Sequence, residues 1–75
     1  MLNYMQMRKR NIEIKKDVAF GKPVIAGTRI SVDFVLELLA EGWSFDKIIK
    51  HYPHLKKQDI FSALDYSKDL VKEWR

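Results

Sequence analysis

The sequence predicts a mainly α-helical protein with three helices and a short β arm in front of them. Three stretches after residue 31 place apolar side chains at the three- and four-residue spacing of amphipathic helices. Each stretch follows a hydrophobic residue and a cap position, and a second hydrophobic residue is placed to pack against the first. Four residues separate the last two helices, which is the proportion of a helix-turn-helix unit.

The β arm is predicted over residues 11–16. Ile12 and Ile14 alternate there with charged residues, which indicates a short strand with one apolar face. A strand needs a partner for the hydrogen-bonding groups along its edges. Two partners fit this strand: the run Val24–Ile25 in the same chain, or the same arm of a second copy.

Local signals at both ends define the helices. The three predicted helices span residues 32–41, 45–51 and 57–73. Ser31 and Ser44 are good caps for the first two, worth about 1 kcal/mol each over alanine, whereas Lys56 is a poor cap for the third. Gly42 can end the first helix in a left-handed conformation, and Pro53 ends the second.

The positive charge is concentrated in the N-terminal part. Residues 1–30 carry seven basic and two acidic side chains, a net +5, and residues 31–75 carry seven basic and eight acidic ones, a net −1. This distribution favours a polyanionic partner. We expect a flexible basic tail, a β arm with its connector, and a three-helix domain, at residues 1–10, 11–30 and 31–75.

Length and composition narrow the class of protein. The 75 residues make one domain, and a chain of this length has a thin core that oligomerisation commonly supports. Cysteine is absent, and no run of about 18 apolar residues occurs, so we expect a cytoplasmic protein without a membrane segment.

The most informative stretch is the decapeptide Gly-Lys-Pro-Val-Ile-Ala-Gly-Thr-Arg-Ile at residues 21–30. It closely resembles the signature of the family catalogued as domain of unknown function 433. The resemblance covers about residues 12–68 and extends through the motifs at 41–44, 52–55 and 63–66. It implies a homeodomain-like helix-turn-helix fold, often encoded beside a PIN-like toxin, and therefore an antitoxin role.

Two groups of residues are candidates for DNA binding. The start of the third helix is the recognition position of a helix-turn-helix, and the polar residues there are Lys56, Lys57, Gln58 and Ser62. The second group follows the arm: Arg8, Lys9, Arg10, Lys15, Lys16, Lys22 and Arg29. Asp59 and Asp65 on the third helix oppose phosphate binding. Arg29, inside the decapeptide, has two interpretations: a phosphate contact, or a structural bond to carbonyls at a helix end.

Catalysis and metal binding are not indicated. His51 and His54 are three residues apart, but Pro53 interrupts the helix between them and no third clustered ligand is evident. No nucleophile with a base and no phosphate-binding glycine loop occurs. We expect no cofactor and no enzyme activity.

The sequence therefore predicts an antitoxin-like DNA-binding protein. It would neutralise a cognate PIN-like nuclease and repress its own promoter, and its partners would be double-stranded DNA, the toxin and a second copy of the chain. Some large apolar side chains exceed what a small core needs, which favours an interface: Phe34, Leu38, Phe61 and Trp74. The alternative is an interaction module that does not bind DNA. For a homodimer, residues 11–30 are the expected interface.

Overall fold

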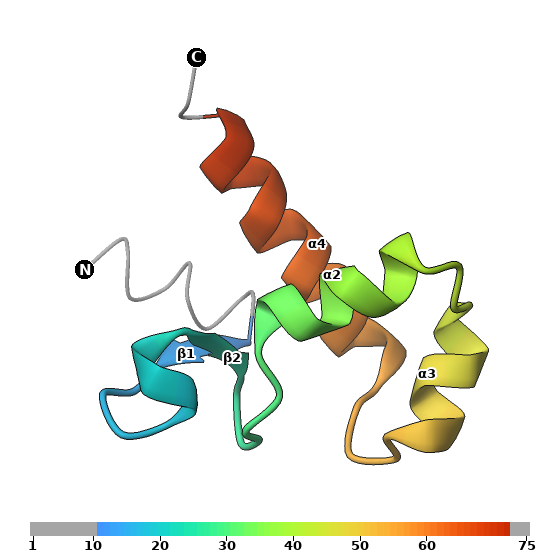
Figure 1. Cartoon of the computed structure of the whole chain (residues 1–75), viewed down its shortest axis with the longest axis horizontal. Helices are drawn as coiled ribbons and strands as arrows, with labels where there is room; N and C mark the ends of the chain where they lie inside the picture. The colour runs from blue at the N-terminus through green and yellow to red at the C-terminus, as the bar shows by residue number, and fades with distance from the viewer. Residues whose placement is uncertain (1–10, 73–75) are drawn as a thin grey trace.

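A computed structural model describes residues 11–72 and shows three helices behind a β-hairpin (Figure 1). The elements in chain order are β1 (Ile12–Ile14), the short 3₁₀ turn η1 (Ala19–Gly21), β2 (Pro23–Ile25), α2 (Val32–Ala40), α3 (Phe45–His51) and α4 (Lys57–Lys72). The predicted fold class and helix positions are confirmed. Among the described residues, no helix is both long and apolar enough to cross a bilayer.

The β arm pairs within its own chain. Strands β1 and β2 are antiparallel, with Ile12 opposite Ile25 and Ile14 opposite Pro23. This is the first of the two predicted pairings, because β2 contains Val24–Ile25. A homodimer in which β1 finds its strand partner in a second copy is therefore wrong. The single apolar face is also only partly used, since Ile12 is buried while Ile14 is 53% exposed.

The connector between β2 and α2 is a turn held by one side chain. The hydroxyl of Thr28 donates to the carbonyl of Ile25 at 2.8 Å and accepts from the amide of Ile30 at 3.0 Å. Gly27, at φ 80°, supplies the left-handed conformation that this turn requires. The decapeptide thus has an architectural role, because it directs the chain from the hairpin into α2.

The predicted caps form at the first two helices. The Ser31 hydroxyl accepts from the amide of Phe34 at 3.2 Å, and the Ser44 hydroxyl accepts from the amide of Lys47 at 3.1 Å. Gly42 follows α2 with φ 96°, as expected for a left-handed helix end. Capping and the glycine stop thus act where the sequence placed them.

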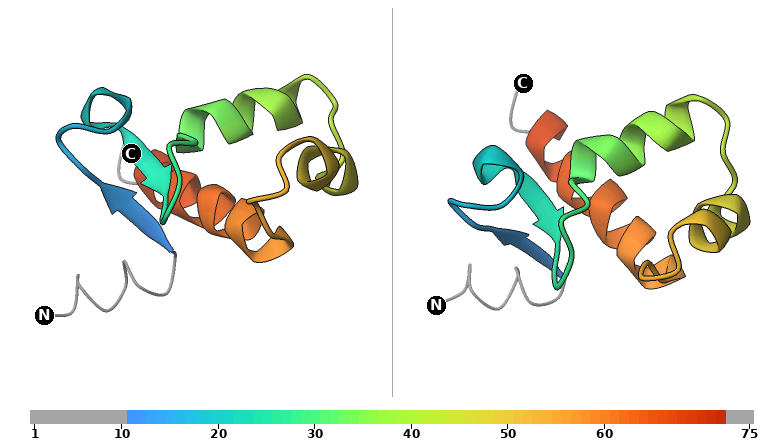
Figure 2. Two further views of the ribbon diagram at one scale, coloured as in Figure 1. Left: turned by 90° about the horizontal axis from the view of Figure 1, so that it is seen from below. Right: turned by 60° about the horizontal axis from the view of Figure 1, so that its bottom comes forward.

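The core lies where the hairpin, α2 and α4 meet, and α3 closes its far end. Its most deeply buried side chains come from every element and from the turn after α3: Ile12, Ile25, Val35, Ile48, Leu55 and Ile60. Figure 2 shows the hairpin at one end of the molecule and α3 at the other, with α2 and α4 between them. Leu38 belongs to this core, so it is not available to a partner as predicted.

Asp33, in the first turn of α2, links that helix to the hairpin. It accepts a hydrogen bond from the Ser31 hydroxyl and pairs with the Lys22 ammonium at 3.1 Å. The Ser31 hydroxyl and then Lys22 hold the pKa of Asp33 below its ordinary value of 3.8. The carboxylate is largely exposed, so the stabilisation is modest.

The pH dependence of this contact is testable with Asp33→Asn. A depressed pKa in the folded state contributes stability above pH 3.8 that is lost as the pH falls through the folded-state value. Urea unfolding should therefore find the wild type more stable than Asp33→Asn at neutral pH, with a difference that shrinks below pH 3.8. A difference that stays constant over this acid range would contradict the assignment.

Candidate nucleic-acid interface

The segment formed by α3, the turn after it and the start of α4 presents a group of exposed basic side chains. Its members are Lys47, Lys50, His51, His54, Lys56 and Lys57. We call this group the basic surface. Sequence reasoning identified only the two lysines beside α4. The spacing of Lys47, Lys50 and His51 at i, i+3 and i+4 on a short helix could have predicted the rest.

Trp43 organises the α3 side of the basic surface. The ammonium of Lys47 lies 4.2 Å from the centre of the Trp43 ring, and the His51 ring packs edge-on against it at 5.0 Å. His51 also contacts the carbonyl of Lys47 through Nδ1 at 3.0 Å. These contacts hold two of the basic side chains in place before a ligand arrives.

Asp59 is the acidic residue in the first turn of α4, and its carboxylate is turned inward. Oδ2 accepts from the backbone amide of Lys56 at 3.0 Å, which is one half of a capping box. Oδ1 accepts from the side-chain amide of Asn11 at 2.6 Å. Asp59 is only 6% exposed, so it does not oppose phosphates at the surface as the sequence suggested. It also compensates for the poor cap Lys56.

The four predicted residues of α4 divide into exposed and buried positions. Lys56, Lys57 and Gln58 are exposed, as expected at a recognition position. Ser62 is buried instead, and its hydroxyl donates to the carbonyl of Gln58 at 3.0 Å. Ser62 lies on the side of α4 that faces the core, so it should be removed from the predicted contact set.

The arm residues do not join the basic surface. Lys15, Lys16 and Lys22 lie at the turn end of the hairpin, across the molecule from α3 in Figures 1 and 2. Lys15 pairs with Glu13 at 3.4 Å, and Lys22 pairs with Asp33. The predicted residues Arg8, Lys9 and Arg10 fall outside the residues that the structure describes.

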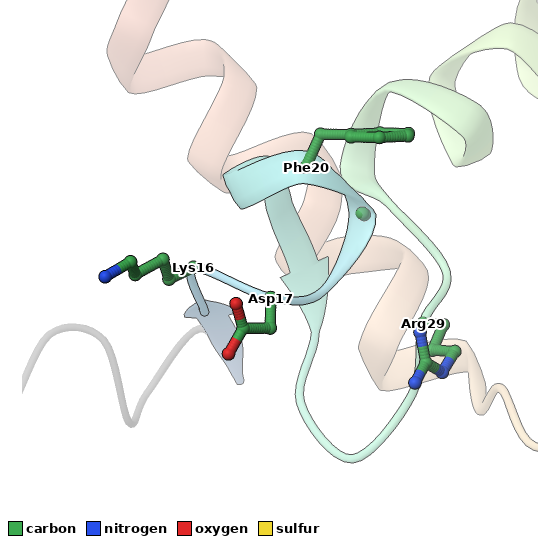
Figure 3. A pocket seen from close by; sticks show the side chains of 5 residues that line it. Lys16, Asp17, Phe20 and Arg29 are labelled. Carbon is green, nitrogen blue, oxygen red and sulfur yellow. The ribbon is translucent and has the colours of Figure 1, made fainter.

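A shallow hollow of about 450 Å³ lies between η1 and the connector. It is lined by Lys16, Asp17, Ala19, Phe20 and Arg29, and Phe20 is 99% exposed on a left-handed backbone with φ 59°. In Figure 3 the side chains of Lys16 and Arg29 point in different directions, so the two cations do not converge on one ligand. Within the described part of the chain, Arg29 makes no hydrogen bond to a carbonyl, which leaves the phosphate contact as its remaining interpretation.

Metal ligands do not cluster in the part of the chain that the structure describes. Between residues 11 and 72, no three histidine, cysteine, aspartate or glutamate side chains are placed to hold an ion together. His51 is engaged with Trp43 and Lys47, as described above.

The fold and the placement of these groups define a small three-helix protein of the helix-turn-helix class with an N-terminal β-hairpin. The chain belongs to the family described as protein of unknown function DUF433, whose family model matches residues 12–67.

A solved structure with this fold is the crystal structure of a DUF433 member protein from Anabaena variabilis. It is 29% identical in sequence, with a TM-score of 0.79 over 96% of this chain and 71% of that one. The comparison with curated proteins found no match.

Proposed function

We propose that this protein binds double-stranded DNA through the basic surface and acts as an antitoxin-like repressor. The observation that carries the proposal is the charge of that surface. Four lysines and two histidines are exposed on α3, the turn and the start of α4, while the carboxylate of Asp59 points inward. A cationic helix-turn-helix of this kind suits the phosphates on either side of a major groove.

The basic surface divides by role in this proposal. Lys47 and Lys50, on the helix that crosses the backbone, would contact phosphates and set the orientation. Lys57 and Gln58, in the first turn of α4, would reach base edges, because lysine can donate to guanine and the amide of glutamine can pair with adenine. Arg29 offers a further phosphate contact from the connector.

Salt titration of duplex binding tests this proposal. Fluorescence anisotropy with DNA from the region upstream of the gene should show affinity that falls about 100-fold between 50 and 200 mM salt, as expected for about four neutralised phosphates. Affinity that does not change with salt, or no binding at low salt, would overturn it. The second result would favour the alternative of an interaction module that does not meet DNA.

The antitoxin part of the proposal needs a protein partner as well as DNA. It is supported by family membership together with exposed apolar groups, among which Phe61 is 50% exposed beside Phe45 on the α3–α4 surface. Co-expression with the product of the neighbouring gene should give a complex that co-purifies and relieves the growth defect caused by that product. Separate elution and normal growth with the neighbour alone would contradict the antitoxin role.

A further inference from the structure

The C-terminal half of α4 extends beyond the rest of the molecule (Figure 1). From Leu64 to Lys72, none of the nine residues is buried, whereas the first half of the helix contributes Ile60 and Ala63 to the core. A helix this short gains too little from its own backbone hydrogen bonds to be stable in water. This half of α4 therefore needs a packing partner.

One face of this segment combines apolar and charged side chains. Leu64 and Val71 are seven residues apart, with Lys68 between them at the four- and three-residue spacing of a helix-packing seam, and Val71 is 69% exposed. Beside this seam, the charged positions follow the order Asp65, Lys68, Asp69, Lys72. Asp65 and Lys68 form an ion pair at 3.1 Å within the helix.

The order of these charges is self-complementary when the helix is reversed. An antiparallel copy, related by a two-fold axis between Lys68 and Asp69, places Asp65 opposite Lys72 and Lys68 opposite Asp69, four opposite-charge pairs in all. A parallel copy in register places like charges opposite each other. Net charge on the face is zero, which suits self-association better than binding to a strongly charged partner.

We propose that this face binds a second copy of the chain as an antiparallel α4–α4′ contact. Leu64, Val71 and the methylene groups of Lys68 pack along the seam, and the Asp–Lys pairs beside the seam set the register. The contact is small compared with a standard interface of about 1,600 Å². We therefore expect a weak dimer that is populated at micromolar or higher concentrations.

The proposed axis sets a distance that bears on DNA binding. Lys57 lies 11.5 residues from the axis, so the two copies of Lys57 are 23 residues apart along the paired helices. At 1.5 Å per residue this is about 34 Å, which matches one turn of B-DNA between half-sites. This consequence rests on the proposed DNA binding, whereas the dimer itself does not.

Sedimentation of the full chain without DNA tests the dimer. We expect a concentration-dependent shift from monomer to dimer that Val71→Asp abolishes. Ile14→Asp, which places the same charge at an exposed apolar position on the hairpin, should leave the dimer intact, and circular dichroism should show both variants folded. A wild-type monomer at every concentration, or an unchanged dimer in Val71→Asp, would overturn the proposal.

Charge-swapped chains test the register. An acidic-face variant, Lys68→Asp with Lys72→Asp, and a basic-face variant, Asp65→Lys with Asp69→Lys, should each be monomeric, and their mixture should restore a 1:1 dimer. Homodimers of either variant would contradict the charge pairing. Dimerisation of the wild type only after deletion of residues 1–10 would assign the face to the chain's own N-terminal segment and would also overturn the proposal.

A DNA arm separates this inference from the proposed function. With dimer formation established in solution, duplexes carrying two half-sites at spacings of about 5, 10 and 15 base pairs should bind best at about 10. Dimerisation without any DNA binding would leave the α4 contact standing and reject the DNA function. DNA binding by a protein that stays monomeric would do the reverse.

Discussion

Ile60→Ala is expected to destabilise the protein by about 2–5 kcal/mol, because the side chain is fully buried and its removal leaves a cavity. Ile60 is the fourth residue of α4 and packs at the centre of the core. It is also positioned to pack against Leu55 at the helix entry. The whole free energy of unfolding of so small a domain is only about 5 kcal/mol, so this one change should leave a large fraction of the chains unfolded.

Urea or thermal unfolding followed by circular dichroism measures this effect. Ile14→Ala is the matched control, since it makes the same substitution at a position that is 53% exposed, and we expect a loss several-fold smaller. Equal losses for the two variants would contradict the core placement of Ile60.

Helix positions could be predicted because their signals are local. Ser31 and Ser44 accept hydrogen bonds from amides three residues later, and Gly42 ends α2 in a left-handed conformation. Each interaction involves residues within one turn of each other, so spacing in the sequence determines it. The same holds for the two positions on α3 and α4 where Ile48 and Ile60 enter the core.

The site was harder to predict because its contacts are distant in sequence. Asp59 was expected to face phosphates, but Asn11, 48 residues earlier, holds one of its oxygens and draws the carboxylate inward. Ser62 was expected at the surface, yet the rotation of α4 against the core buries it. The pairing of β1 with β2 was one of two alternatives, since a strand pattern does not tell which chain supplies its partner.

Lys15 and Lys16 illustrate the limit of net charge as a guide to a surface. The excess of basic residues before position 31 suggested that the arm would carry the DNA contacts. In the structure these two lysines lie at the turn end of the hairpin, away from the basic surface. Net charge summed along a sequence cannot show which side chains share a face, because that depends on how the hairpin packs against α2 and α4.

Reversing the charge of Lys56 and Lys57 together should reduce DNA affinity by about 100-fold or more at moderate salt, if the proposed function holds. Both side chains are exposed at the start of α4, where the proposal places a phosphate contact and a base contact. The salt slope of log K should also become shallower by about two units, because two cations no longer displace counterions. Glutamate at these positions should not harm folding, since acidic residues at a helix N-terminus interact favourably with the helix dipole.

The control for this prediction makes the same change in net charge at the other end of the molecule. Lys15→Glu with Lys16→Glu alters the hairpin turn, away from the basic surface, so it should weaken binding only through the general loss of positive charge. Anisotropy titrations of the two double variants on one duplex, with melting curves to confirm folding, make the comparison. Equal losses of affinity would show that DNA responds to net charge alone and that α4 does not form a recognition surface. A much larger loss for Lys56→Glu with Lys57→Glu locates the contact at the start of α4.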